Sequence, residues 1–278
     1  MKLFRKVAII GTGLIGGSLA LAIRKKHLAA QVVGVSRHRQ TIRQAKAKGA
    51  IDEGSLSLGI IRDADLVVLA TPVNAILSLA PAVAKIIPRG CVVTDVGSTK
   101  LQICRRLEKI FPHFVGSHPL AGSERGGIRN CDAGIFAGSL CLLTPAAHAS
   151  PRALRKLRLL WSRLGAKTVL LSAAEHDRIL SFTSHLPHAL AFSLVSSVPS
   201  RFLKFSSGSL KSTTRITSSD AGLWSDIFLT NREELLKAIG IFEARLSSLK
   251  SAVSRKDAPA LKRFLRQARK KKTQMITD

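Results

Sequence analysis

Tyrosine is absent from the 278 residues and only 5% are aromatic, so the chain offers few side chains for stacking on nucleic-acid bases. Acidic residues are also scarce, because 17 Asp and Glu stand against 44 Lys and Arg, a formal net charge of +27. Such an excess attracts polyanions in a salt-dependent way. The basic residues are scattered along the whole chain, so we expect no specific nucleic-acid partner. A basic dinucleotide-binding protein that docks on polyanions stays an alternative.

Cysteine is rare too. The four thiols form no CxxC pair and no metal-ligand spacing, and a chain of this length needs no disulfide framework; they are Cys91, Cys104, Cys131 and Cys141. No segment offers about 18 uninterrupted apolar residues for a membrane span. The uncharged run 7–23 is broken by four glycines, unlike a signal peptide. We expect a soluble, cytoplasmic protein without a metal site or membrane attachment.

What the sequence does contain is alternation. From Lys6 to Leu171, short runs rich in Val, Ile and Leu alternate with helical stretches, which is typical of a doubly wound, mostly parallel α/β sheet. The expected strands are 7–10, 32–35, 66–70, 92–95, 114–116, 140–144 and 168–171. The expected helices include 14–26, 39–48, 100–110 and 151–164, the last with Ser150 as N-cap and Pro151 in its first turn.

The strand signals end at Leu171, and Ser172–Glu175 fits a capping box that begins an all-α region. A second helix start at Thr230–Glu233 precedes an apolar stripe at helical spacing. That stripe fits either a core or a subunit interface, and it consists of Leu235, Leu236, Ile239, Phe242 and Leu246. We therefore expect one α/β domain over residues 1–171 and one helical domain over 172–278.

A glycine-rich turn directly follows the first expected strand. Gly11-Thr12-Gly13-Leu14-Ile15-Gly16 has the GxGxxG spacing and also opens the first helix, the context of a Rossmann-type dinucleotide site. Gly11 permits the tight turn, Gly13 lets a pyrophosphate approach the backbone, and Gly16 lets the helix pack on the strand. All six are expected to bind the cofactor, together with Thr71 and Asp95 at the ends of later strands.

The second expected strand ends at Ser36-Arg37-His38-Arg39, where NAD-binding proteins place a carboxylate on the ribose 2′-hydroxyl. No carboxylate stands there. A hydroxyl at Ser36 and the guanidinium of Arg37 suit a 2′-phosphate, so NADP is favoured as the cofactor and NAD stays possible. A solvated basic turn is the alternative interpretation.

Two polar segments follow strands at the edge where open α/β sheets bind their ligands. In Thr94–Lys100, Ser98 suits either a hydrogen bond to a substrate hydroxyl or a cap for the next helix. In Gly116–Glu124, His118 has the side chain best suited to proton abstraction near neutral pH, although a lone histidine is usually structural. Ser98 and His118 are the candidate catalytic residues.

The helical part supplies candidate substrate ligands. Ser184-His185-Leu186-Pro187-His188 places two histidines on one face, provided that the helix continues past Pro187 or begins at Ser184. The pair is compatible with metal, but no third ligand with suitable spacing stands out. Arg215 lies in an otherwise apolar helical region, and a buried Arg is rare unless it pairs with a carboxylate of the protein or of a substrate.

Together these segments resemble the prephenate and arogenate dehydrogenase family, in the order that the family shows and over nearly the whole chain. The segments are Gly11–Ser18, Asp95–Lys100, Ser117–Glu124, Glu175–Asp177, Ser184–His188 and Thr214–Ile216. The most specific are His-Pro-Leu-Ala-Gly-Ser-Glu and Ser-His-Leu-Pro-His. Val33–Arg37 also resembles NADP-using arogenate dehydrogenases of the cyanobacterial kind, which favours arogenate as the substrate.

The resemblance implies oxidative decarboxylation of prephenate or arogenate in tyrosine biosynthesis, with hydride transfer to NAD(P)⁺, by a homodimer joined through its helical domain. His118 would take the ring hydroxyl proton, Ser98 would hold that hydroxyl, and Arg215 would bind a substrate carboxylate. The remaining substrate residues would be Ser184, His185 and His188 in the helical wall, and Ser123 and Glu124 at the opening. Another two-domain NADP-dependent hydroxyacid or imine reductase is the alternative within the enzymes.

Overall fold

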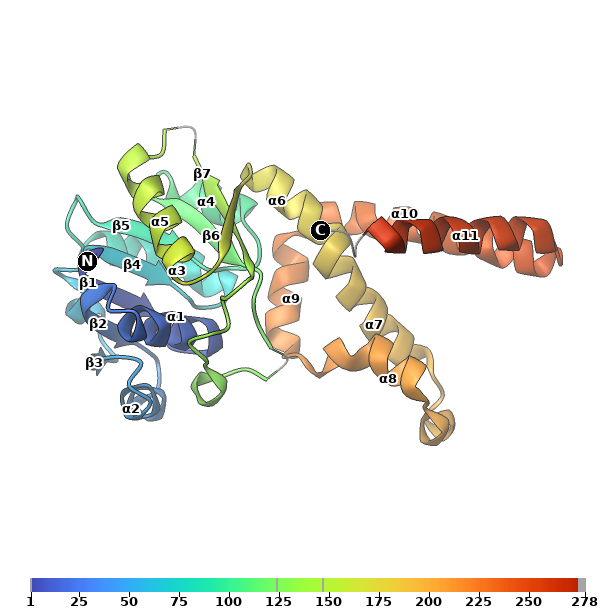
Figure 1. Ribbon diagram of the computed structural model, residues 1–278, viewed down its shortest axis with the longest axis horizontal. Coiled ribbons are helices and arrows are strands. Elements are labelled where there is room, and N and C mark those ends of the chain that lie inside the picture. The colour runs from blue at the N-terminus through green and yellow to red at the C-terminus, as the bar shows by residue number, and fades with distance from the viewer. Residues whose placement is uncertain (1, 124, 147, 275–278) are drawn as a thin grey trace. The chain divides into compact units, whose positions relative to one another are not determined.

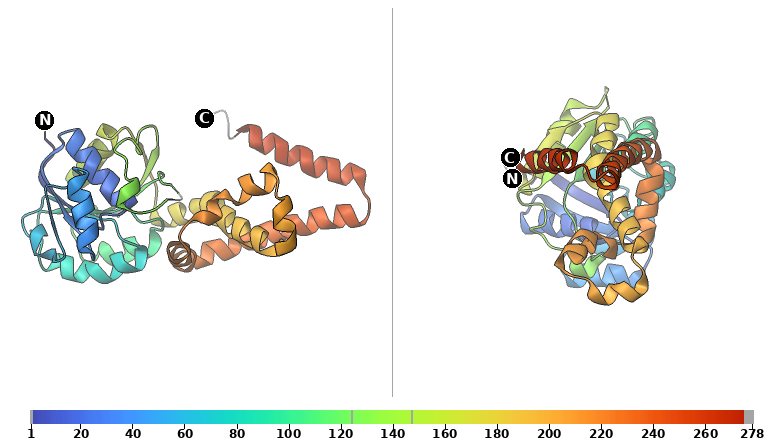
Figure 2. Two further views of the ribbon diagram at one scale, coloured as in Figure 1. Left: turned by 90° about the horizontal axis from the view of Figure 1, so that it is seen from below. Right: turned by 90° about the vertical axis from the view of Figure 1, so that its right-hand side faces the viewer.

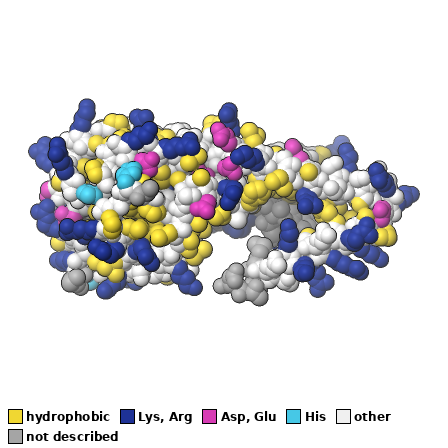
Figure 3. Space-filling model, turned by 90° about the horizontal axis from the view of Figure 1, so that it is seen from above, with side chains coloured by type: hydrophobic (Ala, Val, Ile, Leu, Met, Phe, Trp, Pro, Cys, Tyr) yellow, Lys and Arg dark blue, Asp and Glu magenta, His cyan; other side chains and the backbone are white. Residues whose placement is uncertain are grey.

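The computed structural model describes residues 2–123, 125–146 and 148–274. The chain divides into two compact units, residues 1–232 and residues 233–278. Each helix in the described part is either too short or too polar to span a bilayer. Lys and Arg side chains are spread over the face of the molecule in Figure 3, with few Asp and Glu between them.

A parallel sheet of five strands forms the centre of the first unit (Figure 1). Its strands lie in the order β3-β2-β1-β4-β5, so the chain begins in the middle and winds outward in both directions. They are β1 (Phe4–Ile10), β2 (Ala29–Val35), β3 (Glu53–Ser55), β4 (Leu66–Leu69) and β5 (Val92–Asp95). Because the strands are parallel, the residues that follow β1, β2, β4 and β5 meet at one edge.

Three further strands extend this arrangement. β6 (Val115–Pro119) pairs antiparallel with β7 (Leu140–Pro145), and β7 pairs parallel with β8 (Lys167–Leu170). A parallel bridge between Val93 and Phe114 joins β6 to β5, so β6 also ends at the edge where β5 ends. The predicted Rossmann-type, mostly parallel sheet is confirmed.

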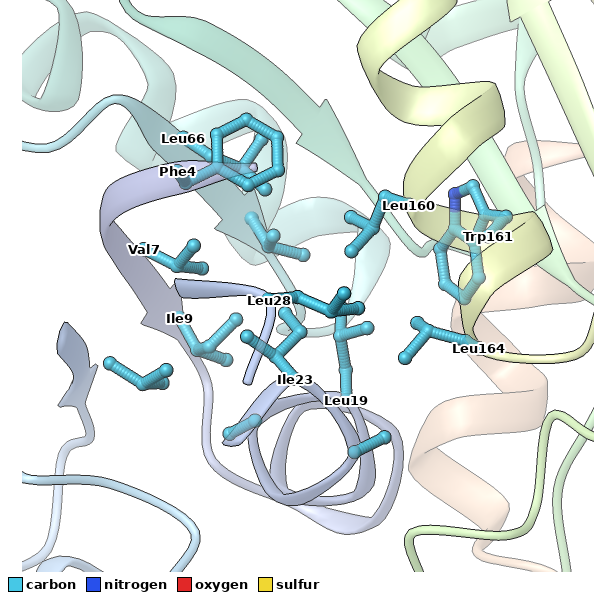
Figure 4. Packing of buried hydrophobic residues seen from close by; sticks show 14 of the residues in the cluster. Phe4, Val7, Ile9, Leu19, Ile23, Leu28, Leu66, Leu160, Trp161 and Leu164 are labelled. Carbon is cyan, nitrogen blue, oxygen red and sulfur yellow. The ribbon is translucent and has the colours of Figure 1, made fainter. Parts of the chain in front are cut away.

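Helices cover both faces of the sheet, and the side chains of each strand alternate between two buried clusters (Figure 1). On β1, Val7 and Ile9 join the cluster under α1 (Leu14–Lys25) and α5 (Pro151–Arg163), which Figure 4 shows from close by. Ala8 and Ile10 join the cluster under α3 (Val73–Ala84) and α4 (Leu101–Leu107). α2 (Arg39–Ala47) contributes Ile42 and Ala45 to the first cluster.

Sequence reasoning did not predict the strand β3 (Glu53–Ser55) or the helix α3 (Val73–Ala84). β3 is only three residues long, too short for a periodic signal. α3 begins after Pro72 and contains Pro81 in its interior, where proline normally argues against a helix. The 3₁₀ helices η1 (Leu58–Ile61) and η2 (Ile128–Asn130) complete the connections.

After β8 the chain is helical, and the predicted capping box is confirmed. The Ser172 hydroxyl accepts the backbone N–H of Glu175, and the Glu175 carboxylate accepts the N–H of Ser172. The elements that follow are α6 (Ala173–Leu180), the π-helical turn η3 (Ser181–His185), α7 (Leu186–Ser197), η4 (Ser200–Phe205), α8 (Gly208–Thr214), η5 (Arg215–Ser218) and α9 (Ala221–Thr230). The helical character predicted after Leu171 is therefore confirmed, whereas a domain boundary at that residue stays a prediction.

The last two helices are α10 (Arg232–Ser254) and α11 (Ala258–Gln274), and they diverge from the turn that joins them (Figure 2). Within the predicted stripe, Leu235 is buried and Ile239 and Phe242 are partly buried. Leu236 and Leu246 are exposed. The stripe is thus neither fully a core nor fully solvated, and the second unit presents apolar side chains that its own two helices do not cover.

All four cysteines are buried free thiols. Burial raises the pKa of Cys91 and Cys104 to about 12. It also raises the pKa of Cys131 and Cys141 above the ordinary thiol value. These side chains are packing residues of the α/β unit.

Candidate active site

The glycine-rich turn has the geometry that its spacing predicts. Gly11 has φ +100°, a left-handed conformation, and an added Cβ would lie 2.5 Å from the carbonyl oxygen of Ala70. At Gly16 an added Cβ would collide with the carbonyl oxygen of Gly11, so α1 packs directly on the turn. At Gly13 no heavy atom of the described chain lies within 4 Å of the added Cβ. The turn is tight where a side chain is excluded and open at the N-terminus of α1.

A pocket of about 910 Å³ lies over this turn, at the carboxyl edge of β1, β2 and β4. The predicted cofactor residues in its wall are Gly11, Thr12, Gly13, Ser36, Arg37 and Thr71. Leu14, Ile15 and Gly16 do not line it, because they lie in the first turn of α1 behind the glycines. Asp95 does not line it either.

Several features of the pocket fit a dinucleotide. The hydroxyl oxygens of Thr12 and Thr71 are buried in its wall without a hydrogen-bond partner among the described residues. A buried hydroxyl is costly unless it is paired, so both oxygens are available to polar atoms of a ligand. The open space at Gly13 and the positive end of α1 suit a pyrophosphate. The residues present therefore fit NAD(P).

The end of the pocket at β2 carries two guanidinium groups. Arg37 follows the strand, as predicted, and Arg129 of η2 reaches the same pocket from a distant part of the chain. With its amide oriented to satisfy both groups, Gln44 of α2 accepts hydrogen bonds from Arg129 at 3.1 and 3.2 Å. Sequence reasoning missed Arg129, since nothing in the local pattern around η2 connects it to β2.

Beside the pocket, where β5 and β6 end, lies a buried charged cluster. Asp95 and Lys100 form an ion pair in which both side chains are 0% exposed. The Asp95 carboxylate also accepts the backbone N–H groups of Gly97 at 2.8 Å and Ser117 at 3.3 Å. Burial raises the pKa of Asp95, while the Lys100 ammonium opposes that shift. Asp95, predicted as a cofactor residue, lies in this cluster and fixes the loop that carries Ser98.

The histidine predicted as a base belongs to a chain of three side chains. His118 Nδ1 lies 2.8 Å from His176 Nε2, and His176 Nδ1 lies 2.8 Å from Asp177 Oδ1. Burial lowers the pKa of His118 well below its ordinary value, and His176 and Lys100 lower it further. Burial also lowers the pKa of His176 to about 2. Both rings are therefore neutral near pH 7, the state that a proton acceptor requires.

The predicted wall histidines lie on either side of the junction between η3 and α7. His185 is buried and its Nδ1 lies 3.0 Å from the Asn231 amide nitrogen. His188 donates from Nδ1 to the Ser184 carbonyl oxygen at 2.9 Å and stacks on Trp224 with ring centroids 3.4 Å apart. The helix continues past Pro187 as the sequence required, although through a π-helical turn. Trp224 was not predicted, because tryptophan in an amphipathic helix most simply indicates core.

The other predicted residues are more exposed. Ser98 is partly buried between buried Gly97 and Thr99. Ser123 lies in an exposed loop, where its hydroxyl accepts the N–H of Arg125, and Glu124 lies outside the described residues. Arg215 is exposed at the start of η5, which contains no buried residue. Among the described residues no group of three or more His, Cys, Asp or Glu is arranged to hold a metal ion.

A dinucleotide pocket and a neutral histidine at one edge of a Rossmann sheet define an NAD(P)-dependent oxidoreductase. Comparison with known proteins assigns the family. The nucleotide-binding domain model of prephenate dehydrogenase matches residues 19–170, and the dimerization domain model of the same enzyme matches residues 172–267. The chain belongs to the prephenate dehydrogenase family.

Individual relatives agree with this family. The chain is 33% identical to the cyclohexadienyl dehydrogenase of Zymomonas mobilis, with 100% of this chain and 98% of the relative covered. The Aquifex aeolicus prephenate dehydrogenase, solved with hydroxyphenyl propionate and NAD⁺, superposes with a TM-score of 0.93 at 32% identity and 98% coverage of both chains. The Synechocystis arogenate dehydrogenase gives a TM-score of 0.84 at 27% identity, covering 97% of this chain and 99% of that one. These relatives favour the dehydrogenase interpretation over a polyanion-binding protein or another reductase.

Proposed function

We propose that the protein oxidatively decarboxylates arogenate or prephenate in tyrosine biosynthesis and prefers NADP⁺ as hydride acceptor. One observation carries this proposal: His118, a neutral imidazole held at the carboxyl edge of β6, lies on the same sheet edge as the dinucleotide pocket. An alcohol carbon that loses hydride must also lose its hydroxyl proton, so a neutral base beside a nicotinamide is the required pair. The names of the relatives supply the substrate class.

The chemistry of each side chain indicates its role in binding or in proton transfer. Bound NADP⁺ supplies an electrophilic nicotinamide carbon that accepts the hydride. His118 takes the ring hydroxyl proton, and Ser98 holds that hydroxyl. Arg215 binds a substrate carboxylate, because a planar guanidinium matches two carboxylate oxygens. Ser184, His185 and His188 line the helical wall, with Ser123 and Glu124 at its opening. The ketone formed in the ring favours loss of CO₂, since that loss makes the ring aromatic.

The cofactor preference rests on the pocket end at β2. Ser36 and Arg37 are present where an acidic residue would repel a 2′-phosphate, and Arg129 adds a second positive group to the same wall. Two guanidinium groups and a hydroxyl suit a phosphate better than a ribose hydroxyl.

We further propose a homodimer through the helical domain, residues 172–278. The matched dimerization domain model and the exposed apolar side chains of α10 and α11 support it; these side chains are Leu236, Ile241, Leu246, Val253 and Leu265. Burying them against a second copy removes apolar surface from water. Size-exclusion chromatography with light scattering measures the mass, and a monomer at micromolar concentration would contradict the dimer.

The free thiols suit a reducing cytoplasm, where we place this pathway step.

Steady-state kinetics with the four combinations of arogenate or prephenate and NADP⁺ or NAD⁺ test the proposed reaction. We expect reduced cofactor and CO₂ to form in equal amounts, fastest with arogenate and NADP⁺. Turnover with NAD⁺ alone would overturn the cofactor preference. Silence with all four combinations would overturn the proposed reaction.

A further inference from the structure

The segment Glu175-His176-Asp177 has no role in the division of work above, yet two of its side chains are among the most deeply buried polar groups of the protein. His176 is 0% exposed and Asp177 is 1% exposed. Both lie in the first turns of α6, which brings them against the ends of β5 and β6. Buried polar groups are retained at a cost in stability unless their hydrogen bonds are satisfied, so the partners of these two residues indicate what they do.

The carboxylate of Asp177 is held as a hydrogen-bond acceptor. Oδ1 accepts the backbone N–H of Lys100 at 2.7 Å, and Oδ2 accepts the backbone N–H of Leu101 at 2.9 Å. Burial raises the pKa of Asp177, while the backbone N–H groups of Leu101 and Lys100 and the positive charge of Lys100 oppose that shift. Because each of its two oxygens accepts a main-chain N–H, the carboxylate is held as an acceptor. His176 Nδ1, 2.8 Å from Oδ1, must therefore carry a hydrogen and donate it.

This arrangement determines the tautomer of the next ring. A neutral histidine that carries its hydrogen on Nδ1 has a lone pair on Nε2. His176 Nε2 therefore accepts, and His118 Nδ1, at 2.8 Å, donates. The lone pair of His118 is left on its Nε2, on the side of the ring opposite to His176. We infer that His176 and Asp177 are positioning residues that fix His118 in the tautomer whose free Nε2 accepts the substrate proton.

The same chain stabilises the product of proton transfer. When the hydroxyl proton moves to His118 Nε2, the ring becomes an imidazolium with a hydrogen on both nitrogens, and its Nδ1–H remains bonded to His176. The proton leaves to water after the product departs. Before transfer, Lys100 and Asp95 neutralise each other and Asp177 leaves one negative charge uncompensated. Through the hydrogen bonds of His176, this negative charge stabilises the positive charge of the His118 imidazolium.

Other titratable groups near His118 either oppose its protonation or are uncharged. Besides burial, His176 from α6, Lys100 from the start of α4 and His185 from η3 all lower its pKa. The Cys141 thiol on β7, across the strand pair, is protonated because its pKa is raised. Asp177 is therefore the anion that makes proton uptake possible at a buried site.

The test uses substitutions at Asp177 and His176 that alter their hydrogen bonds but largely keep the side-chain volume. In Asp177→Asn an amide replaces the carboxylate, so His176 no longer has to carry its hydrogen on Nδ1. In a hydrolase triad, a substitution that gives the histidine the wrong tautomer lowers kcat about 10⁴-fold. We expect kcat to fall roughly 10² to 10⁴-fold while the KM for substrate and the Kd for dinucleotide change less than about threefold. His176→Gln keeps an acceptor for His118 but breaks the link to Asp177, so it should retain more activity than His176→Leu. Arg178→Gln, one residue further on and exposed, is the matched control and should leave kcat unchanged.

A spectroscopic measurement separates this inference from the proposed reaction on which it rests. Nitrogen NMR of isotopically labelled histidine, recorded with the whole protein, should show His118 protonated at Nδ1 in the wild type and redistributed toward Nε2 in Asp177→Asn. In His176→Gln the acid limb of the kcat/KM profile should lie at lower pH than in the wild type, because the His118 imidazolium has lost its link to the Asp177 anion. A wild-type His118 protonated at Nε2, or an Asp177→Asn variant with normal kcat, would overturn the inference. Inactivity of the wild type with the Nδ1 tautomer present would overturn only the proposed reaction.

Discussion

The Lys100 ammonium and the Asp95 carboxylate form an ion pair from which water is excluded, because neither side chain has any exposed surface. The pair joins the end of β5 to the start of α4. It thereby sets the loop that holds Ser98 and the two N–H groups that bind Asp177. Stability and site geometry depend on the same contact.

Removing one partner of this pair should be costly. Lys100→Met leaves the Asp95 carboxylate buried without its cation, and breaking a buried pair in this way typically costs about 3–5 kcal/mol. Urea unfolding measures the loss. The control is Lys6→Met, which breaks the partly exposed pair with Asp63 and should cost less than about 1 kcal/mol. Equal losses in the two variants would contradict the buried pair's importance.

Two glycines of the turn should respond differently to the same substitution. In Gly16→Ala the new Cβ meets a backbone oxygen, so we expect destabilisation by about 1–3 kcal/mol. In Gly13→Ala the Cβ enters open space, so the protein should remain stable but bind dinucleotide more weakly. Thermal unfolding and dinucleotide titration measure the two effects. Gly13→Ala with unchanged dinucleotide affinity would remove Gly13 from the pyrophosphate site.

Cofactor preference should depend on the guanidinium groups at β2. Arg37→Ala removes a charged hydrogen bond to a 2′-phosphate, which is worth about 1.5–3 kcal/mol, so the Kd for NADP⁺ should rise roughly tenfold or more. The Kd for NAD⁺ should change little, and Arg129→Ala should act in the same sense. Arg43→Ala, also on the α2 side but outside the pocket wall, serves as the control. Equal losses for both cofactors would indicate that Arg37 does not read the phosphate.

Replacing the base itself gives the simplest kinetic prediction. His118→Asn removes the proton acceptor, so kcat should fall by about 10² to 10⁴ with dinucleotide binding preserved. Pre-steady-state measurement of hydride transfer locates the loss in the chemical step. Normal turnover would exclude His118 as the base.

The buried histidines make stability depend on pH. Burial lowers the pKa of His185 to about 4, whereas in the unfolded chain it keeps its ordinary value of about 6.5. Between these values the unfolded chain binds a proton that the folded protein does not, so this group's contribution is fully present above pH 6.5 and is lost as pH falls. The stability of the wild type relative to His185→Gln should therefore fall by about 1.4 kcal/mol per pH unit in that window.

Urea unfolding of both proteins at pH 7, 6 and 5 checks this slope. A constant difference between the two proteins over this range would show that His185 protonates in the folded protein as it does in the unfolded one.

Local patterns were enough to predict the framework. The apolar runs of β1 and β2, the glycine spacing and the capping box at Ser172 each depend on neighbours in the chain, and each is found as predicted. What sequence reasoning missed depends on distant contacts. The hydrogen-bonded rings of His118 and His176 are 58 residues apart in sequence. Arg129 and Arg37 line one pocket although they are far apart in the chain.

The burial of every cysteine gives the protein a practical property. Thiolates are the reactive form, and thiols with pKa values near 12 are almost entirely protonated at pH 7. The native thiols of the wild-type protein should therefore react little with thiol-directed labels. A single cysteine introduced at an exposed polar position of α11 would react with a maleimide probe far faster than the four native thiols, so a fluorophore or spin label can be attached there without first removing them.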